Sequence, residues 1–238
     1  KMRTVKAGED GRIYVGGLQQ FGYFVPNKLG RLEYVCLSDS IDKHMIGNIW
    51  NIHIAGNRIY FQSDHAIFYL EKERLHQIAC RDIIYSALVD KRLYVAGNGL
   101  SVLNGDTLLQ LPNSTSYINN MSKRIVGIFP YQNKLLLVSN QHGLFLYENG
   151  TFVPFRSTAD EFLKKNRLRC ATMKGPLLAL GTVQNGLLLL NLDTGSTEHI
   201  STHNGLQNKA ILSLFFDREE NLWLGLDNGI DCVHLHSP

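Results

Sequence analysis

Two acidic segments near the end of the chain carry side chains that could do chemistry. Asp217-Arg218-Glu219-Glu220 offers carboxylates for acid–base catalysis, and Asp227-Asn228-Gly229-Ile230-Asp231 offers oxygen ligands for calcium. The first segment lies between two apolar stretches, so we interpret it as a solvated turn between strands. The second lacks the alternating ligands and the distal glutamate of a calcium loop, which favours a hairpin turn.

Histidine and cysteine form no metal-binding or catalytic pattern. Five histidines have no repeated ligand spacing and are interpreted as surface or turn residues: His142, His199, His203, His234 and His236. Four cysteines lie far apart, without a CxxC pair, each in an apolar pattern: Cys36, Cys80, Cys170 and Cys232. This usage favours buried free thiols over disulfides. We therefore expect no metal, no cofactor and no catalytic residues, and so no enzyme activity in this chain.

The basic residues argue against a nucleic-acid partner. The chain has 24 Lys and Arg against 21 Asp and Glu, a formal net charge of +3, and the basic residues are thinly spread. A nucleic-acid-binding protein concentrates such charge on one face. The single basic cluster favours a solvated helix end over an anion site: Lys164, Lys165, Arg167 and Arg169.

An internal repeat sets the elements that must position any functional side chain. A turn followed by an alternating apolar strand recurs six times, anchored at Ile13, Ile59, Leu93, Leu135, Leu177 and Leu222. The spacings are 46, 34, 42, 42 and 45 residues, with a mean near 42. A four-stranded propeller blade takes roughly 40–50 residues. The period therefore predicts an all-β β-propeller with about six four-stranded antiparallel blades.

Each repeat also has the internal pattern of four strands. A nearly continuous apolar stretch precedes the anchor, as in residues 125–129, and is typical of an innermost strand. The anchor strand comes second, and a turn rich in Gly, Asn and Gln leads to the third. A tight hairpin such as Asn149-Gly150 then leads to the fourth strand. Pro154 fits that fourth strand, because proline is confined to sheet edges.

The repeats predict one propeller over residues 1–238, with blades at 4–36, 49–80, 84–112, 125–156, 168–201 and 210–236. The last blade stops after its third strand, so we expect a fragment of a seven-bladed or double propeller. Only residues 158–165 are predicted to be helical, with Thr158 and Glu161 at capping-box spacing. Aromatic residues one position beyond the anchors are assigned to packing between blades: Tyr14, Tyr60, Tyr94 and Trp223.

Loops at one end of the blades are the predicted binding face. In a propeller, the connections into each new blade and the turns between second and third strands lie at the same end, and loops on a rigid scaffold carry function. Aromatic rings there could stack on sugar faces, while amides bind hydroxyl groups. The candidate ligand-binding residues are Trp50, Asn51, His65, Asn98, Tyr117, Asn119, Arg124, Gln141, His142, Gln184, Asn185, Asn208 and Asn228.

The sixth repeat carries a recognisable signature. It reads Asn204-Gly205-Leu206, Ile211-Leu212-Ser213-Leu214, Asp217, Asn221-Leu222-Trp223-Leu224-Gly225 and Asn228-Gly229-Ile230. This resembles the propeller repeat of two-component regulators, and the first and fifth repeats match it in part. In blades two to four the tryptophan and the Gly-Thr pair are lost, and Leu226 stands where threonine is usual. The motif is structural, so the resemblance transfers no ligand residue.

The resemblance implies a function and a location. Such repeats are typical of periplasmic sensor regions of hybrid two-component histidine kinases in Bacteroides-like bacteria. It implies an oligosaccharide-responsive module in signal transduction, joined to a second propeller, a β-sandwich, a membrane helix and a kinase, and dimeric in the full protein. Two alternatives stay open. A propeller scaffold for protein–protein interaction needs an exposed apolar patch, and a propeller hydrolase or lyase needs convergent carboxylates or a His–carboxylate group.

Overall fold

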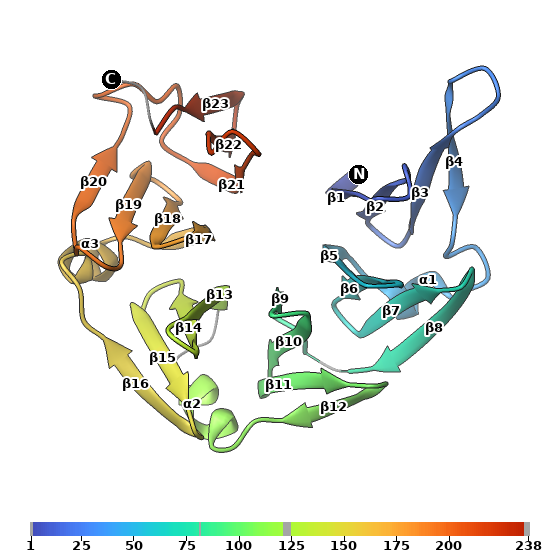
Figure 1. Cartoon of the computed structure of the whole chain (residues 1–238), viewed down its shortest axis with the longest axis horizontal. Helices are drawn as coiled ribbons and strands as arrows, with labels where there is room; N and C mark the ends of the chain where they lie inside the picture. Colours follow the sequence, from blue (N-terminus) through green and yellow to red (C-terminus); the bar gives the residue numbers. More distant parts are fainter. Residues whose placement is uncertain (1, 81, 121–124, 236–238) are drawn as a thin grey trace. The chain divides into compact units, whose positions relative to one another are not determined.

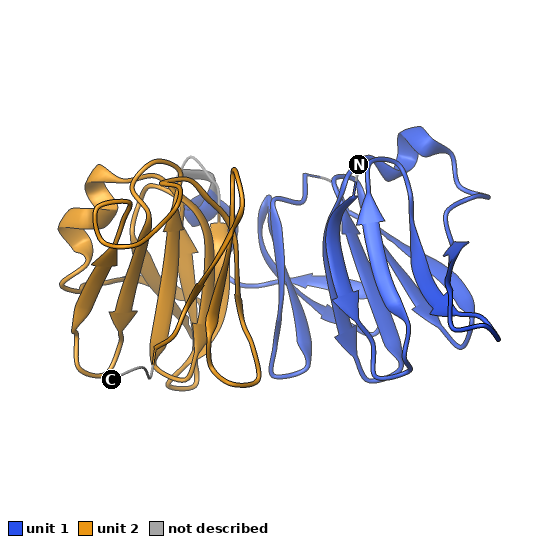
Figure 2. Ribbon diagram, turned by 90° about the horizontal axis from the view of Figure 1, so that it is seen from above, with its two compact units in different colours: residues 1–120 blue, residues 121–238 orange. Residues whose placement is uncertain are grey.

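The computed structural model describes residues 2–80, 82–120 and 125–235, and it divides into two compact units. Unit 1 covers residues 1–120 and unit 2 covers residues 121–238 (Figure 2). The described residues form six antiparallel sheets, five with four strands and one with three, and the strands of every sheet follow chain order (Figure 1). The predicted fold class is therefore confirmed: the chain is an all-β six-bladed β-propeller.

Unit 1 holds the first three blades. Blade 1 is β1 (Met2–Ala7), β2 (Ile13–Gly17), β3 (Phe21–Pro26) and β4 (Leu32–Cys36). Blade 2 is β5 (Ile49–Ala55), β6 (Arg58–Ser63), β7 (Ala66–Glu71) and β8 (Arg74–Ala79). Blade 3 is β9 (Tyr85–Val89), β10 (Arg92–Gly97), β11 (Gly99–Asn104) and β12 (Thr107–Gln110). The short helices α1 (Lys43–Ile46) and α2 (Ser114–Asn120) lie in the connections that follow blades 1 and 3.

Unit 2 holds the other three blades. Blade 4 is β13 (Ile125–Tyr131), β14 (Lys134–Ser139), β15 (Leu144–Glu148) and β16 (Thr151–Phe155). Blade 5 is β17 (Leu168–Lys174), β18 (Leu177–Thr182), β19 (Leu187–Asn191) and β20 (Thr197–Ile200). Blade 6 is β21 (Ile211–Phe216), β22 (Leu222–Leu226) and β23 (Ile230–Val233). Helix α3 (Asp160–Lys165) lies between blades 4 and 5.

Two-residue turns join consecutive strands tightly. At Asn149-Gly150 both residues have positive φ, 48° and 79°, which gives the twist that a two-residue hairpin requires. The same pair of positive angles occurs at Lys72-Glu73, Asp90-Lys91 and Gln132-Asn133, where neither residue is glycine. Pro154 lies on β16, the edge strand of blade 4, as predicted.

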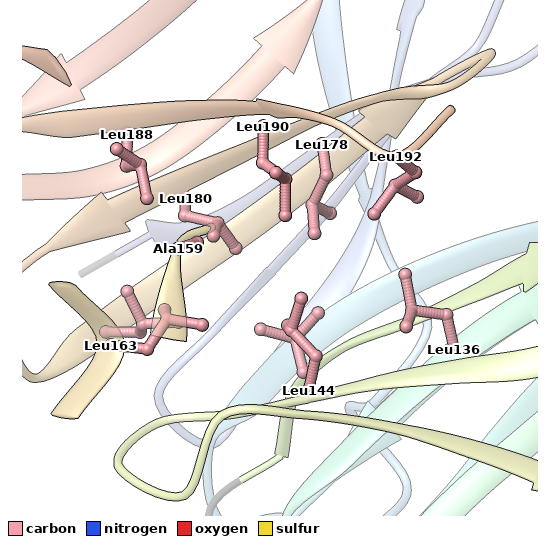
Figure 3. Close-up of a cluster of buried hydrophobic side chains, with 11 residues drawn as sticks. Leu136, Leu144, Ala159, Leu163, Leu178, Leu180, Leu188, Leu190 and Leu192 are labelled. Carbon is pink, nitrogen blue, oxygen red and sulfur yellow. The ribbon is translucent and has the colours of Figure 1, made fainter. Parts of the chain in front are cut away.

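Apolar side chains fill the space between neighbouring blades. In unit 2, leucines from β14 and β15 face leucines from β18 and β19, and Leu163 of α3 closes one end of the cluster (Figure 3). Burial of one leucine stabilises the fold by roughly 1.5–3 kcal/mol. The cluster comprises Leu136, Val138, Leu144, Ala159, Leu163, Leu168, Leu178, Leu180, Leu188, Leu190 and Leu192. Within each unit, neighbouring blades are thus held face to face by apolar layers.

Two glycines allow close approach between blades. A Cβ atom at Gly16 would lie 2.4 Å from Ile49 Cγ2 of the next blade. A Cβ atom at Gly181 would lie 2.8 Å from Ile211 Cγ2, again on the next blade. Both glycines are on second strands, at the position where the propeller repeat carries glycine, so this part of the motif is a packing requirement.

Arginines tie neighbouring blades of unit 1 together at the opposite end from the predicted binding face. Arg58 donates to Glu71 within its own blade at 2.9 Å and to Asp106 of blade 3 at 2.8 Å. Its guanidinium carbon lies 4.6 Å from the centre of the Tyr69 ring. Arg12 of blade 1 has the same arrangement. Its guanidinium carbon lies 4.4 Å from the centre of the Tyr23 ring, and it donates to Glu73 of blade 2 at 2.8 Å.

The structure corrects the helix predictions. Residues 158–165 were the only predicted helix, but α1 and α2 are also helical. Both are short, and α2, with the sequence STSYINN, has no apolar period that could reveal it. At α3 the predicted capping pair is displaced by one residue. Ser157 N donates to Asp160 Oδ1 and Ser157 Oγ accepts from Ala159 N, while Thr158 binds Gly195 O instead.

Two further assignments change with the register. Leu178, not Leu177, is equivalent to the other anchors, because it lies three residues before Gly181, as Ile13 lies three before Gly16. Trp223 was assigned to packing between blades, but 43% of its surface is exposed. Tyr14 and Tyr60 are buried as expected. Trp223 differs because no described residues cover that face of blade 6.

Candidate functional site

A repeated β-bulge shapes the start of the first strand in five of the six blades. The ladder between first and second strands shifts by one residue there, for example between Ile49 and Asn51. One residue inside each shift is left out of the pairing: Arg3, Trp50, Val126, Arg169 and Leu212. Bulges of this kind re-aim a side chain and are common beside functional sites. They therefore mark one position in each of these five blades, at the end where the binding face is predicted.

In unit 1 the bulge residues of neighbouring blades meet. The guanidinium carbon of Arg3, on β1, lies 4.5 Å from the centre of the Trp50 ring, on β5. Trp50 keeps 38% of its surface exposed. A cation over an aromatic face is an attractive contact. We call Arg3, Asn48, Trp50 and Asp64 the Trp50 platform.

Asp64 fixes the indole of the platform. Its Oδ1 accepts from Trp50 Nε1 at 2.5 Å, and its Oδ2 accepts from Asn48 N at 2.8 Å and Asn48 Nδ2 at 3.0 Å. Partial burial would raise the pKa of Asp64, but these hydrogen bonds outweigh it and hold the pKa below its usual value. Asp64 therefore stays ionised, with both oxygens engaged, and orients Trp50.

A polar network links β5 to its neighbours β6 and β9. Gln62 Oε1 accepts from Asn51 Nδ2 and from Ser86 Oγ, each at 2.9 Å. Because Ser86 gives its proton to Gln62, it accepts from His53 Nε2 at 2.8 Å. Burial, together with the charge of Lys6, lowers the pKa of His53 to about 4. Gln62 Nε2 is buried without a partner among the described residues, which leaves one amide donor of this network unused.

The predicted residues that the structure describes in unit 1 belong to the same end of their own blades, and Arg124 belongs to the sequence of unit 2. Trp50 and Asn51 begin β5, and His65 lies in the β6–β7 turn beside Asp64. Asn98 lies in the β10–β11 turn, where its carbonyl accepts from Gln110. Tyr117 lies in α2. Asn119 is also in α2, its side chain is not described, and Arg124 lies outside the described residues.

The predicted residues of unit 2 lie at the corresponding end of blades 4 to 6. They occupy the β14–β15, β18–β19 and β22–β23 turns and the segment before β21: Gln141, His142, Gln184, Asn185, Asn228 and Asn208. Asn185 N donates to Thr182 Oγ1 at 2.7 Å, and its carbonyl lies 2.8 Å from His199 Nε2. Asn208 Oδ1 accepts from Ala210 N at 2.9 Å, as expected of a turn residue.

A small hollow brings together two of these residues. It has a volume of about 230 Å³ and is lined by Gln141, His142, Gly143, Leu144, Pro154, Phe155, Arg156, Asp160, Leu163 and Lys164. Ser139 Oγ accepts from His142 N at 3.2 Å and so fixes the turn. Arg156 lies 3.4 Å from Asp160. The hollow could hold a small polar ligand; of its two basic residues, Arg156 is paired with Asp160, and Lys164 is the other.

Sequence reasoning found Trp50 but missed its partners. Arg3 and Asp64 were not among the candidates, because neither belongs to a motif. A weak signal exists at the bulges: an aliphatic residue, any residue, then a small or polar one, as in Ile49-Trp50-Asn51, Leu168-Arg169-Cys170 and Ile211-Leu212-Ser213. The middle residue is the one that leaves the ladder.

The acidic segments behave as turns. Asp217 Oδ1 accepts from Glu219 N and Asn221 N, both at 2.9 Å, and Asp217 Oδ2 accepts from Trp223 Nε1 at 2.8 Å. Asp231 accepts from Gln207 N at 2.9 Å. Among the described residues no three His, Cys, Asp or Glu side chains gather into a group that could hold a metal ion. The four cysteines are free thiols, and burial raises the pKa of Cys170 to about 12.

Fold and site together define a repeat protein of the β-propeller class, with an aromatic platform in its first unit. No family model matches the chain. No curated protein matches it either. Within the part of the chain that the structure describes, none of the helices has the length and apolar character needed to cross a membrane.

Solved structures resemble the chain over nearly its whole length. The extracellular domain of the hybrid two-component system BT4673 from B. thetaiotaomicron is 20% identical, with a TM-score of 0.60, and the match covers 99% of this chain and 38% of that one. Virginiamycin B lyase from Staphylococcus aureus is 16% identical, with a TM-score of 0.67 and coverage of 95% and 77%. The WD40 β-propeller domain of Doa1 is 11% identical, with a TM-score of 0.72 and coverage of 97% and 77%.

These similarities support the fold and no particular chemistry. The matched proteins include an extracellular domain of a two-component system, a lyase and a WD40 domain, so one architecture carries different functions. The chain spans less than two fifths of the length of the extracellular domain that it matches. Function must therefore be argued from the residues of the site.

Proposed function

We propose that this chain is part of the ligand-sensing propeller region of a hybrid two-component sensor histidine kinase, that it lies in the periplasm, and that it binds an oligosaccharide without converting it. The similarity to an extracellular sensor domain over 99% of the chain supports this assignment. So does the repeat signature of blade 6, which resembles that of two-component regulators.

One observation carries the proposal: Trp50 is held rigidly while its ring stays accessible. Asp64 accepts a hydrogen bond from the indole nitrogen of Trp50 at 2.5 Å, and 38% of the surface of Trp50 is exposed. An apolar ring that is fixed before binding loses little conformational entropy when a ligand stacks on it. Sugar rings present apolar C–H faces with hydroxyl groups at their edges. Trp50 offers the flat apolar surface, and Asn51 and His65 supply polar groups at the same end of blade 2.

Signal transmission would follow from a shift in population. A ligand that binds one arrangement of the parent protein more tightly than another shifts the equilibrium by its difference in affinity. The partners in this proposal are the rest of the parent chain, including a second propeller, a β-sandwich, a membrane helix and a kinase, and a second copy in a dimer.

The test uses the two tryptophans of the chain, Trp50 and Trp223. In a Trp223→Phe variant, Trp50 is the only indole, so its fluorescence reports binding directly. We would titrate this variant with a panel of purified oligosaccharides and measure melting temperatures in parallel, because a ligand specific to the native state raises the midpoint. Product analysis by chromatography would show whether the glycan is consumed.

We expect one glycan class to change Trp50 emission and to raise the melting temperature, and we expect the Trp50→Ala variant to lose at least about 90% of the affinity, roughly tenfold. Trp223→Ala is the matched control, because it removes an equally exposed tryptophan outside the platform. Equal loss in both variants, or no response to any glycan, would contradict the proposal. Consumption of the glycan would identify an enzyme instead.

A protein-docking scaffold is the second candidate function, and the outer face of blade 6 favours it. Phe215 and Trp223 are cross-strand neighbours, and Ile230 lies one strand further on. Their exposed fractions are 62%, 43% and 66%. The same face of blade 5 is covered by blade 6, through Cys170, Ala179 and Leu187. The exposed face thus has the chemistry of an interface between blades, and another β-sheet is the partner that fits it.

A further inference from the structure

We propose that the oligosaccharide bound at the Trp50 platform is acidic, carrying a carboxylate or a sulfate group that Arg3 recognises. This inference rests on the proposed glycan-binding function. It concerns which chemical group the site selects, and it follows from the state of the guanidinium of Arg3.

Arg3 is a cation without a counter-ion among the described residues. With the described residues, the Arg3 side chain forms no salt bridge within 4.0 Å and no hydrogen bond within 3.5 Å. Its guanidinium carbon instead lies 4.5 Å from the centre of the Trp50 ring. Asp64, the acidic residue of the platform, forms no salt bridge with Arg3; its oxygens accept hydrogen bonds from Asn48 and Trp50 instead. The guanidinium therefore keeps its planar set of N–H donors available for a ligand.

Two other arginines of unit 1 provide an internal comparison. Arg12 lies 4.4 Å from the Tyr23 ring and Arg58 lies 4.6 Å from the Tyr69 ring, as Arg3 does over Trp50. Each of these two also binds a carboxylate of the next blade at 2.8 Å, Glu73 and Asp106 respectively.

Arg3 has the same contact with an aromatic ring, but it has no carboxylate partner among the described residues. A stacked guanidinium has a fixed plane, and a fixed plane suits two parallel hydrogen bonds to a carboxylate or sulfate. We infer that the ligand supplies the anionic group that Glu73 and Asp106 supply elsewhere. A sugar bound against the part of Trp50 that Arg3 leaves exposed would bring a charged substituent within reach of the guanidinium.

The position of Arg3 is fixed by the fold rather than by a flexible loop. Arg3 and Trp50 are the bulge residues of adjacent first strands, so they lie at equivalent levels of neighbouring blades. Gly16 permits this closeness, since a side chain there would collide with Ile49, which precedes Trp50. The pair is thus built by the packing of blade 1 on blade 2.

The experiment compares one glycan in charged and neutral forms. The probes are trigalacturonic acid, its fully methyl-esterified form, and a sulfated glycosaminoglycan disaccharide beside its desulfated form. Binding is followed by Trp50 fluorescence in the Trp223→Phe background and by calorimetry, at low and at physiological salt. The variants are Arg3→Gln and Arg3→Lys, with Arg31→Gln as a control in the exposed β3–β4 turn. Circular dichroism melting verifies that each variant folds.

We expect the charged form of at least one pair to bind roughly tenfold more tightly than its neutral form, with a preference that weakens as salt rises. Arg3→Gln should abolish the preference and leave the weak binding of the neutral form. Arg3→Lys should retain part of the preference, and Arg31→Gln all of it. The pair that responds distinguishes carboxylate from sulfate.

The possible failures are distinct. Equal binding of charged and neutral forms, or a charge preference unchanged by Arg3→Gln, overturns the inference about Arg3 and leaves the glycan-binding function standing. Failure of every probe to bind, together with failure of the neutral panel, overturns both.

Discussion

At the scale of single residues, the chemistry of this chain depends on how acidic and aromatic side chains fix one another. Asp64 and Asp217 each hold the indole nitrogen of a tryptophan, at 2.5 Å and 2.8 Å. The two tryptophans are both partly exposed, yet Arg3 lies over Trp50. That contact distinguishes a candidate binding residue from an exposed one.

The partly buried imidazole of His53 predicts a pH dependence of stability. Its pKa is lowered from 6.5 to about 4 in the folded chain by burial and by the charge of Lys6. As the pH falls, His53 takes up a proton in the unfolded chain before it does so in the folded chain. The contribution of neutral His53 to the free energy of unfolding is therefore complete above pH 6.5 and is lost as the pH falls toward 4. The loss is on the order of 3 kcal/mol.

Urea unfolding between pH 7.5 and 4.5 measures this dependence. The His53→Gln variant keeps a donor for Ser86 but does not titrate, so its unfolding free energy should fall less over this interval. Parallel curves for the two proteins would show that His53 is not the responsible group.

Residue-level prediction from sequence was incomplete for a physical reason. Trp50 was found because it lies next to the long connection into blade 2, at the end of the blades where binding residues are expected. Arg3 and Asp64 were missed because an isolated arginine or aspartate carries no signal until the fold brings it to a partner. Arg3 lies 47 positions before Trp50 in the sequence and meets it only through blade packing.

At the scale of the elements, the strands were predictable and helix α3 was predicted from capping-box spacing, whereas α1 and α2 were missed. Alternating apolar residues and paired turn residues predict strands over many positions, and an error in one position changes little. The register is more sensitive, since Leu177 and Leu178 are both leucine and only the ladder distinguishes them. Helices of four to seven residues, such as α1 and α2, are too short to show a period.

The contact between Gly16 and Ile49 predicts a coupling between two blades. Gly16→Ala places a methyl group 2.4 Å from Ile49 Cγ2, and we expect it to destabilise the fold by about 1–3 kcal/mol. Ile49→Ala alone removes buried volume and costs about 2–5 kcal/mol. The double variant should lose less than the sum of the two, because the second change makes room for the first. Denaturant unfolding of all four proteins gives the coupling, and simple additivity would refute it.

At the scale of the whole molecule, the period of the repeat was sufficient to predict the architecture. A spacing near 42 residues allows four strands, and six anchors give the six sheets observed. The same consideration cannot predict a ligand, because propeller repeats encode packing between blades. The residues that differ from one blade to the next, such as the bulge residues, are the ones that can give each blade its own binding properties.

The outer face of blade 6 predicts self-association of this chain. Contiguous exposed apolar side chains favour contact with other apolar surfaces, and Phe215 is 62% exposed on that face. We expect sedimentation velocity to show association that increases with concentration, and Phe215→Glu to reduce it by introducing charge. Val153→Glu, on the edge strand β16 of blade 4, is the control, since Val153 is also exposed. Identical sedimentation of wild type and Phe215→Glu would contradict the expectation.

The division of the Trp50 platform between two blades has a mechanical consequence. Arg3 belongs to β1 and Trp50 to β5, and no backbone hydrogen bond of the ladders joins these two strands. A ligand that binds both Arg3 and Trp50 would link the two blades and resist sliding of one sheet against the other. Ligand binding would then stiffen the interface between the two blades. A force on either sheet would be resisted in proportion to the strength of ligand binding.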